Sequence, residues 1–109
     1  MKKKNIIRKS REYEKILKDC SPIKNEYFYV FKEENNLDEY RFGISVSKKI
    51  GAAVRRNKIK RQIKEILDKN RYKKGFDCVI ILRSKIKELD FSEKERKMND
   101  LLHKIDIVE

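Results

Sequence analysis

Apolar side chains recur every three or four residues in three stretches of the chain, a spacing typical of amphipathic helices. The first stretch contains Tyr13, Ile16 and Leu17, and Ser10 is placed to cap it. The second carries the apolar stripe Ile59, Ile63, Ile66 and Leu67. We therefore expect helices over residues 10–19, over roughly 16 residues after Gly51, and from Asp90 or Ser92 to about Ile105.

Three other stretches have the composition and pattern of strands. Residues 27–32 are aromatic and β-branched, and residues 40–47 alternate apolar with polar side chains. Because only a short polar link joins these two stretches, we expect them to pair as antiparallel neighbours. Residues 77–83 form a continuous apolar run, which is typical of a strand buried on both faces. A short additional strand is expected around Ile23.

The predicted order of elements is α-β-β-β-α-β-α, without repeats or internal linkers. Helices packed on a small mixed sheet of about four strands make an α+β sandwich, and 109 residues fit a single domain, residues 1–109. No apolar stretch is long enough to cross a membrane, and the basic start of the chain lacks the apolar segment of a secretory signal. Cys20 and Cys78 have no disulfide or metal-ligand spacing, so we expect free thiols and a cytoplasmic protein.

Charge changes this picture by pointing to a partner. The chain has 30 Lys and Arg against 18 Asp and Glu, a net charge of +12. Residues 1–11 contribute +6 and residues 41–64 contribute +9, and neither segment contains an acid. Such an uneven distribution indicates a surface aimed at a polyanion. We expect residues 1–9 to be a flexible basic arm. The predicted basic helix has an aliphatic face without Trp or Phe, which favours a nucleic acid over a membrane surface.

Side chains for catalysis by the protein itself are scarce. His103, in the last predicted helix, is the only histidine, and no known nucleophile or nucleotide-binding motif occurs. The carboxylates of residues 33–39 lie in a polar turn, where a solvated loop is favoured over a metal site. We expect no catalytic residue, metal site or cofactor on the protein.

Two features suit RNA. The helix after Gly51 presents a cation at almost every turn, and Asn57 can donate to a phosphate or to a base edge. Like charges at this spacing cost a free helix about 0.2–0.5 kcal/mol per pair, which an anionic partner would offset. The aromatic strand must pack one face on helices. Its other face either stacks on single-stranded bases or is also part of the core.

The stretch from Arg41 to Glu65 reads R-x-G-x-S-V-S-K-K-x-G-x-A-V-x-R-N-K-x-K-R-x-x-K-E and resembles the signature of the bacterial ribonuclease P protein family. The basic start, Tyr13, the aromatic strand and the apolar strand after Gly75 also match, so the resemblance covers essentially the whole chain. The third residue of the family's RNR motif is Lys58 here, which keeps the charge but not the planar fork of arginine. Leu17 stands where an aromatic residue is common in the family.

The resemblance implies a left-handed βαβ crossover, against the usual rule. It implies the protein component of a ribonucleoprotein endoribonuclease that removes the 5′ leader of precursor tRNA. Its partners would be ribonuclease P RNA and precursor tRNA, with no membrane and no obligate protein partner. The RNA would perform the hydrolysis with Mg²⁺, which the holoenzyme requires. The residues implied to bind RNA are Lys48, Lys49, Arg56, Asn57, Lys58, Lys60, Arg61 and Lys64. Those implied for a leader-binding cleft are Tyr13, Leu17, Tyr29 and Phe31.

A structural RNA-binding protein of the ribosomal type is the alternative. It would share the size and the charge of this chain, but it would not explain the dense pattern between Arg41 and Glu65.

Overall fold

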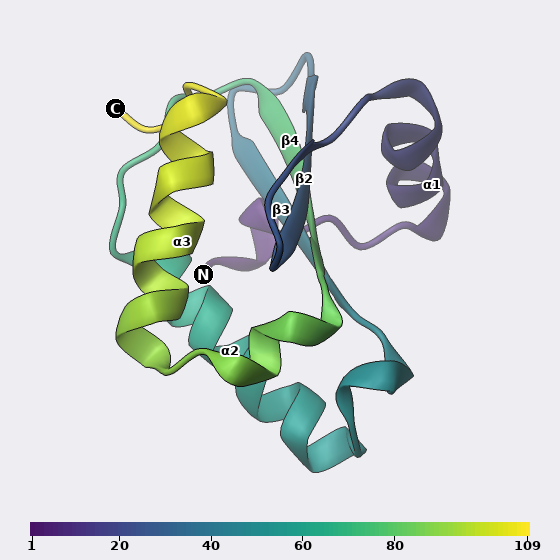
Figure 1. The fold of residues 1–109 in the computed structure, drawn as a ribbon. Coiled ribbons are helices and arrows are strands. Elements are labelled where there is room, and N and C mark those ends of the chain that lie inside the picture. The colour runs from purple at the N-terminus through teal and green to yellow at the C-terminus, as the bar shows by residue number, and fades with distance from the viewer.

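A four-stranded sheet separates one helix from the other two in the computed structural model, which describes residues 1–109 (Figure 1). The helices are α1 (Ser10–Asp19), α2 (Ala53–Asp68) and α3 (Phe91–Lys104), and the strands are β1 (Ile23–Lys24), β2 (Phe28–Glu34), β3 (Tyr40–Val46) and β4 (Phe76–Leu82). Short 3₁₀ turns cover Lys3–Asn5, Lys48–Ile50 and Ser84–Glu88. The predicted order of elements, including the short strand at Ile23, is confirmed. None of the helices is long and apolar enough to span a membrane.

The predicted pairing of the second and third strands is wrong. The sheet order is β1-β2-β4-β3, so β4 lies between β2 and β3, antiparallel to the first and parallel to the second. β4 is apolar except for Asp77, and only a central position between two strands and two helix layers buries both of its faces. The link from β2 to β3 passes over Gly75, whose amide donates to Glu39 and whose carbonyl accepts from Asn35. It is therefore long enough to span one intervening strand.

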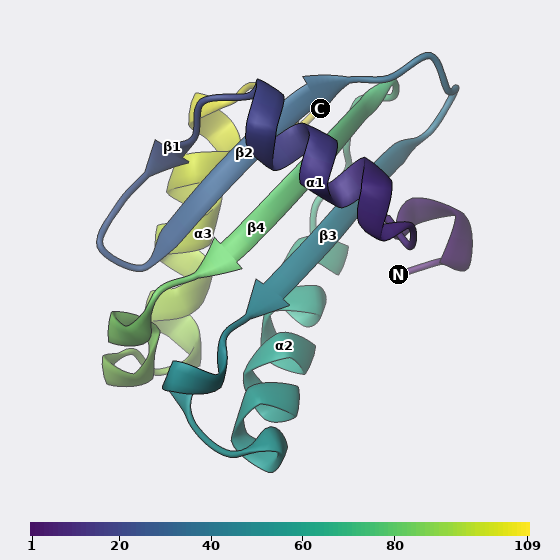
Figure 2. The ribbon, with the colours of Figure 1, turned by 90° about the vertical axis from the view of Figure 1, so that its right-hand side faces the viewer.

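The connection from β3 through α2 to β4 joins two parallel neighbours. Seen from the α1 side, α2 lies behind the sheet, which makes the crossover left-handed (Figure 2). This geometry places the start of α2 beyond the end of β3, at the open edge of the sheet.

The two faces of the sheet carry different cores. Even-numbered residues of β2 and β4 point toward α2 and α3, where 20 buried residues form the main cluster. Odd-numbered residues point toward α1, where only Ile7, Ile16, Phe31 and Val79 form a second buried cluster. The larger cluster anchors α2 through the stripe predicted from its sequence, Ile59, Ile63, Ile66 and Leu67.

Helix starts differ in how they are capped. The predicted cap at Ser10 is wrong, because Ser10 is already helical and Lys9 occupies the cap position without a side-chain hydrogen bond. At α3, Asp90 accepts from the Glu93 amide at 2.9 Å and Glu93 reaches back to the Asp90 amide at 3.3 Å. This reciprocal capping box confirms one of the two predicted caps for the last helix.

The first residues, for which the sequence predicts a flexible basic arm over 1–9, lie against the body of the domain. Asn5 and Ile7 are buried, and the Ile7 amide donates to the Phe42 carbonyl at 2.9 Å. The amino group of Met1 lies 3.0 Å from Asp68. This segment therefore runs along the outer edge of β3 and narrows the space between α1 and α2.

Candidate nucleic-acid interface

The basic surface begins where β3 ends. Ile50 is buried and anchors the 3₁₀ turn, so Lys48 and Lys49 are left exposed. The chain then turns sharply at Gly51, whose φ of 142° favours glycine. The Arg56 guanidinium donates to the Gly51 carbonyl at 3.2 Å and so ties the first turn of α2 to this loop.

The outward side of α2 is strongly cationic. Its apolar stripe is buried in the main core, so the remaining side chains project away from the sheet. Asn57, Lys58, Lys60 and Arg61 are exposed, and Arg56 and Lys64 are half-buried. None of the six cations of α2 lies within 4.0 Å of a carboxylate. The helix therefore presents charge that the protein does not neutralise.

The eight residues predicted to bind RNA do not form one flat patch. Lys60 and Lys64 turn toward the first residues of the chain and line a pocket there. Lys58 lies on the opposite flank, where its charge helps to lower the pKa of Lys94 on α3. Asn57 and Arg61 project between these flanks, by the 100° advance per residue of a helix. The basic surface thus wraps around α2.

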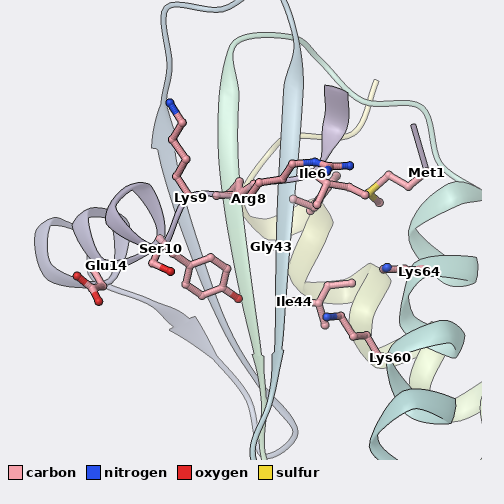
Figure 3. Close-up of a pocket in the computed structure, with 13 residues that line it drawn as sticks. Met1, Ile6, Arg8, Lys9, Ser10, Glu14, Gly43, Ile44, Lys60 and Lys64 are labelled. Atoms are coloured by element: carbon pink, nitrogen blue, oxygen red, sulfur yellow. The ribbon is translucent and has the colours of Figure 1, made fainter. Parts of the chain in front are cut away.

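The pocket beside α2 has a volume of about 400 Å³ and lies at the edge of β3 (Figure 3). Lys60 and Lys64 approach it from α2, and Ser10 and Glu14 from α1. Arg8 and Lys9, in the segment before α1, add two further cations that the sequence analysis had not assigned to a site. Its apolar lining includes Ile6, Phe42 and Ile44. Cations over an apolar floor suit a nucleotide, with its charged phosphate and flat base.

Tyr13 stands between this pocket and the exposed part of the sheet. Its ring lies directly over Gly43, where a Cβ atom would collide with it. Its hydroxyl is buried and has no hydrogen-bond partner, and burial raises the pKa of Tyr13 to about 12. An unsatisfied buried hydroxyl costs stability.

The register of the sheet decides which face of β2 meets α1. Tyr29 pairs with Ile81, and Ile81 with Ser45, which makes one row across the sheet. The next row on this face consists of Phe31, Val79 and Gly43. Because α1 covers the second row, Phe31 is only 8% exposed and belongs to the core under the helix.

The first row stays partly open. Tyr29, Ile81 and Ser45 are half-buried, as is Leu17 on α1. The Arg83 guanidinium lies over the Tyr29 ring at 4.7 Å from its centroid and adds a cation that the sequence analysis had not placed. Of the predicted cleft residues, Tyr13, Leu17 and Tyr29 thus border an accessible surface, and Phe31 supports it from below.

An ion-pair network fixes the first turn of α1 to the sheet. Arg41 donates to both carboxylate oxygens of Asp77, at 2.8 and 2.7 Å, and to Glu12 of α1 at 2.8 Å. These hydrogen bonds raise the pKa of Arg41 above its usual value. Arg41 therefore does not contribute to the unneutralised charge, although it belongs to the basic segment 41–64. A sequence signal for this role existed, because Asp77 is the one acid of a buried strand and buried acids need a partner.

The remaining candidate groups lie away from this surface. His103 is exposed near the end of α3, and Cys78 is buried in the sheet, where burial raises its pKa. Neither reaches the pocket.

Comparison with known proteins gives one consistent result. The family model for ribonuclease P matches residues 1–106. The chain is 37% identical over 107 residues to the ribonuclease P protein component of Bacillus pumilus, covering 95% of this chain and 90% of that protein. It is 41% identical over 106 residues to the component of Thermotoga maritima, covering 92% and 91%.

Solved structures of ribonuclease P proteins are similar to this chain in fold as well. The ribonuclease P protein of Staphylococcus aureus superimposes with a TM-score of 0.87 at 31% identity, covering 96% of this chain and 98% of that one. The protein from Thermotoga maritima gives a TM-score of 0.82 at 38% identity, covering 92% and 96%. The α+β fold predicted from the sequence is thereby confirmed.

Proposed function

The chain belongs to the ribonuclease P protein family, and we propose that it is the protein subunit of ribonuclease P, binding the catalytic RNA and the 5′ leader of precursor tRNA. The observation that carries the proposal is the unneutralised cationic surface of α2 next to a partly open aromatic face. A ribosomal-type role would need only the first of these, and the family match favours the ribonuclease.

The exposed cations of α2 and of the turn before it are the proposed contact with ribonuclease P RNA. Lys48, Lys49 and Arg61 are exposed, make no ion pair within the protein, and can follow a phosphate backbone. Asn57 stands among them and can donate to a phosphate or a base edge. Since each neutralised phosphate releases counterions, affinity for this RNA should fall by about 0.7–0.9 log units per tenfold rise in salt for each contact.

The partly open face of the sheet is the proposed site of the leader. Tyr29 offers a ring on which a base can stack, and Leu17 and Tyr13 form the wall on the α1 side. Lys60 and Lys64 lie beyond Tyr13, where they can hold phosphates of the same strand. A single strand placed here would run from the sheet toward α2, and so toward the RNA bound there.

We assign hydrolysis to the RNA partner and its Mg²⁺. Mg²⁺ prefers oxygen ligands, and three carboxylates on the α1 side of the sheet are already engaged, Glu12 and Asp77 by Arg41 and Glu33 by Lys15. The protein's part is to bind and orient the substrate, which lowers the metal concentration that cleavage needs.

The test is reconstitution. Ribonuclease P RNA and precursor tRNA are incubated at low Mg²⁺ with and without the protein, and release of the leader is followed. We expect the protein to restore cleavage, and Lys48→Gln/Lys49→Gln/Arg61→Gln to restore less while remaining folded. A protein that binds the RNA without stimulating cleavage would contradict the proposal.

A further inference from the structure

A lysine is buried between α2 and α3 without a counterion. Lys94 of α3 is only 7% exposed, and its ammonium donates to the Gln62 side chain of α2 at 2.7 Å. An ammonium has three N–H donors, and this is the one side-chain hydrogen bond that Lys94 makes. Two donors therefore remain for a ligand.

The surroundings of Lys94 add positive charge. Burial lowers its pKa, and the charges of Lys58 and Arg55 on α2 lower it further, against a smaller opposite effect of Asp90. Asp90 is occupied by the cap of α3, where its carboxylate accepts from the Glu93 amide at 2.9 Å. Lys94 makes no ion pair with this or any other carboxylate.

The neighbouring polar contacts between α3 and the C-terminal end of α2 carry no net charge. Lys69 pairs with Glu95 at 2.8 Å, and Asn70 donates to Asn99 at 2.9 Å. At the other end of this α2–α3 contact, the pair of Lys94 and the neutral Gln62 leaves one positive charge uncompensated. A buried unpaired charge destabilises a protein unless a ligand compensates it.

We propose that Lys94, Arg55 and Lys58 form a phosphate-binding site at the seam between α2 and α3. The ligand is a phosphodiester of the RNA that α2 binds, so the inference rests on the function proposed above. Arg55 and Lys58 are exposed and lie three residues apart on one flank of α2, where a backbone phosphate can reach both. Arg55 offers a planar fork to two oxygens, and Lys94 supplies donors from beneath. The RNA-binding surface thereby extends from α2 onto α3.

The first arm of the test uses inorganic phosphate and needs no RNA. The ammonium resonance of Lys94 is followed by NMR during a phosphate titration of the folded protein. We expect a saturable shift that is weaker in Arg55→Gln. Lys94→Gln, which removes the charge, and Lys104→Gln, which removes an exposed charge of the same helix, are compared by thermal unfolding. Phosphate should raise the Tm of Lys94→Gln less than that of Lys104→Gln.

The second arm measures affinity for ribonuclease P RNA over a range of salt. Lys94→Gln should weaken binding about three- to tenfold at low salt and reduce the salt slope by about one relative to Lys104→Gln. Equal behaviour of the two variants would overturn the site while leaving the proposed function intact. A phosphate response without an effect on RNA would mark an adventitious ion only and would also overturn it. Failure of the wild-type protein to bind the RNA would instead contradict the proposed function.

Discussion

The two faces of the sheet are closed to different degrees. The face under α2 and α3 is sealed by 20 buried residues, including the rings of Phe28 and Phe42. The face under α1 has a cluster of four buried apolar residues and the Arg41 network, and the row of Tyr29 and Ile81 stays half-buried. The difference indicates a division of work, in which one face supplies stability and the other keeps a surface for a ligand.

The largest expected difference in folding stability is between the replacement of one residue on each face. Phe42 is 1% exposed and packs against three aromatic rings, so Phe42→Ala should lower the free energy of unfolding by about 3–5 kcal/mol. Leu17→Ala on the α1 face should cost about 1 kcal/mol or less, because Leu17 is already half-exposed to water. Chemical denaturation measures both values. Equal losses would remove the distinction between the faces.

The Arg41 network supports the face under α1. Breaking it should cause the next largest loss of folding stability. Arg41→Met leaves the Asp77 carboxylate, with a side chain 7% exposed, without its cation, which should cost about 3 kcal/mol. Lys49→Met removes the same charge from the same basic segment at an exposed position. It should leave stability unchanged and weaken binding of ribonuclease P RNA. A reversed pattern would show that Arg41 belongs to the RNA surface.

Gly43 tests how closely α1 approaches the sheet. Gly43→Ala places a methyl group against the Tyr13 ring and should destabilise the protein by about 1–3 kcal/mol. The same change made together with Tyr13→Ala should cost much less than the sum of the two single changes, since the obstructing ring is then gone. A full double-mutant cycle by denaturation measures the coupling. Additive effects would mean that Gly43 and Tyr13 do not act on each other.

The pocket cations should affect binding and leave the fold unchanged. Lys60→Gln combined with Lys64→Gln should reduce the salt slope for binding of precursor tRNA to the holoenzyme, by about 0.7 for each phosphate that these lysines neutralise. Their removal should not lower the Tm, because neither lysine has an ion-pair partner. Lys104→Gln at the end of α3 is the matched control. An unchanged slope would place the RNA elsewhere.

The smallest expected effect belongs to the Tyr13 hydroxyl. Tyr13→Phe should leave stability unchanged or raise it by about 1 kcal/mol at neutral pH, because the buried hydroxyl has no partner. Burial raises the pKa of Tyr13 from 10.0 to about 12, so the unfolded chain loses this proton first. The wild-type protein should therefore lose stability relative to Tyr13→Phe as the pH rises from 10 toward 12. Parallel pH–stability profiles of the two proteins would contradict this assignment.

Helices and strands were predictable because each follows a local period. The stripe from Ile59 to Leu67 placed α2, and the apolar run after Gly75 placed β4. Strand order was not predictable in the same way, because the short link from β2 to β3 suggested a hairpin. The need to bury both faces of β4 outweighed that local signal.

The basic surface was predictable from charge and spacing. Which of its cations are paired within the protein, and which are unpaired, was not predictable. Arg41 and Lys48 are both cations of the acid-free segment 41–64, yet Arg41 is paired with the buried carboxylate of Asp77. Lys94 carries no signal of its own, since its burial depends on how α3 packs against Gln62. Which cation is paired and which is free is decided by tertiary contacts between residues far apart in the chain.

We propose that one domain holds the catalytic RNA on α2 and the leader on the α1 face of the sheet. The most direct measurement is the ratio of affinities for precursor and mature tRNA, taken with the reconstituted holoenzyme and repeated with Tyr29→Ala. We predict that the wild-type holoenzyme prefers the precursor and that Tyr29→Ala reduces this preference while affinity for mature tRNA is unchanged. Equal affinities for the two tRNAs with the wild-type protein would contradict leader binding on the sheet.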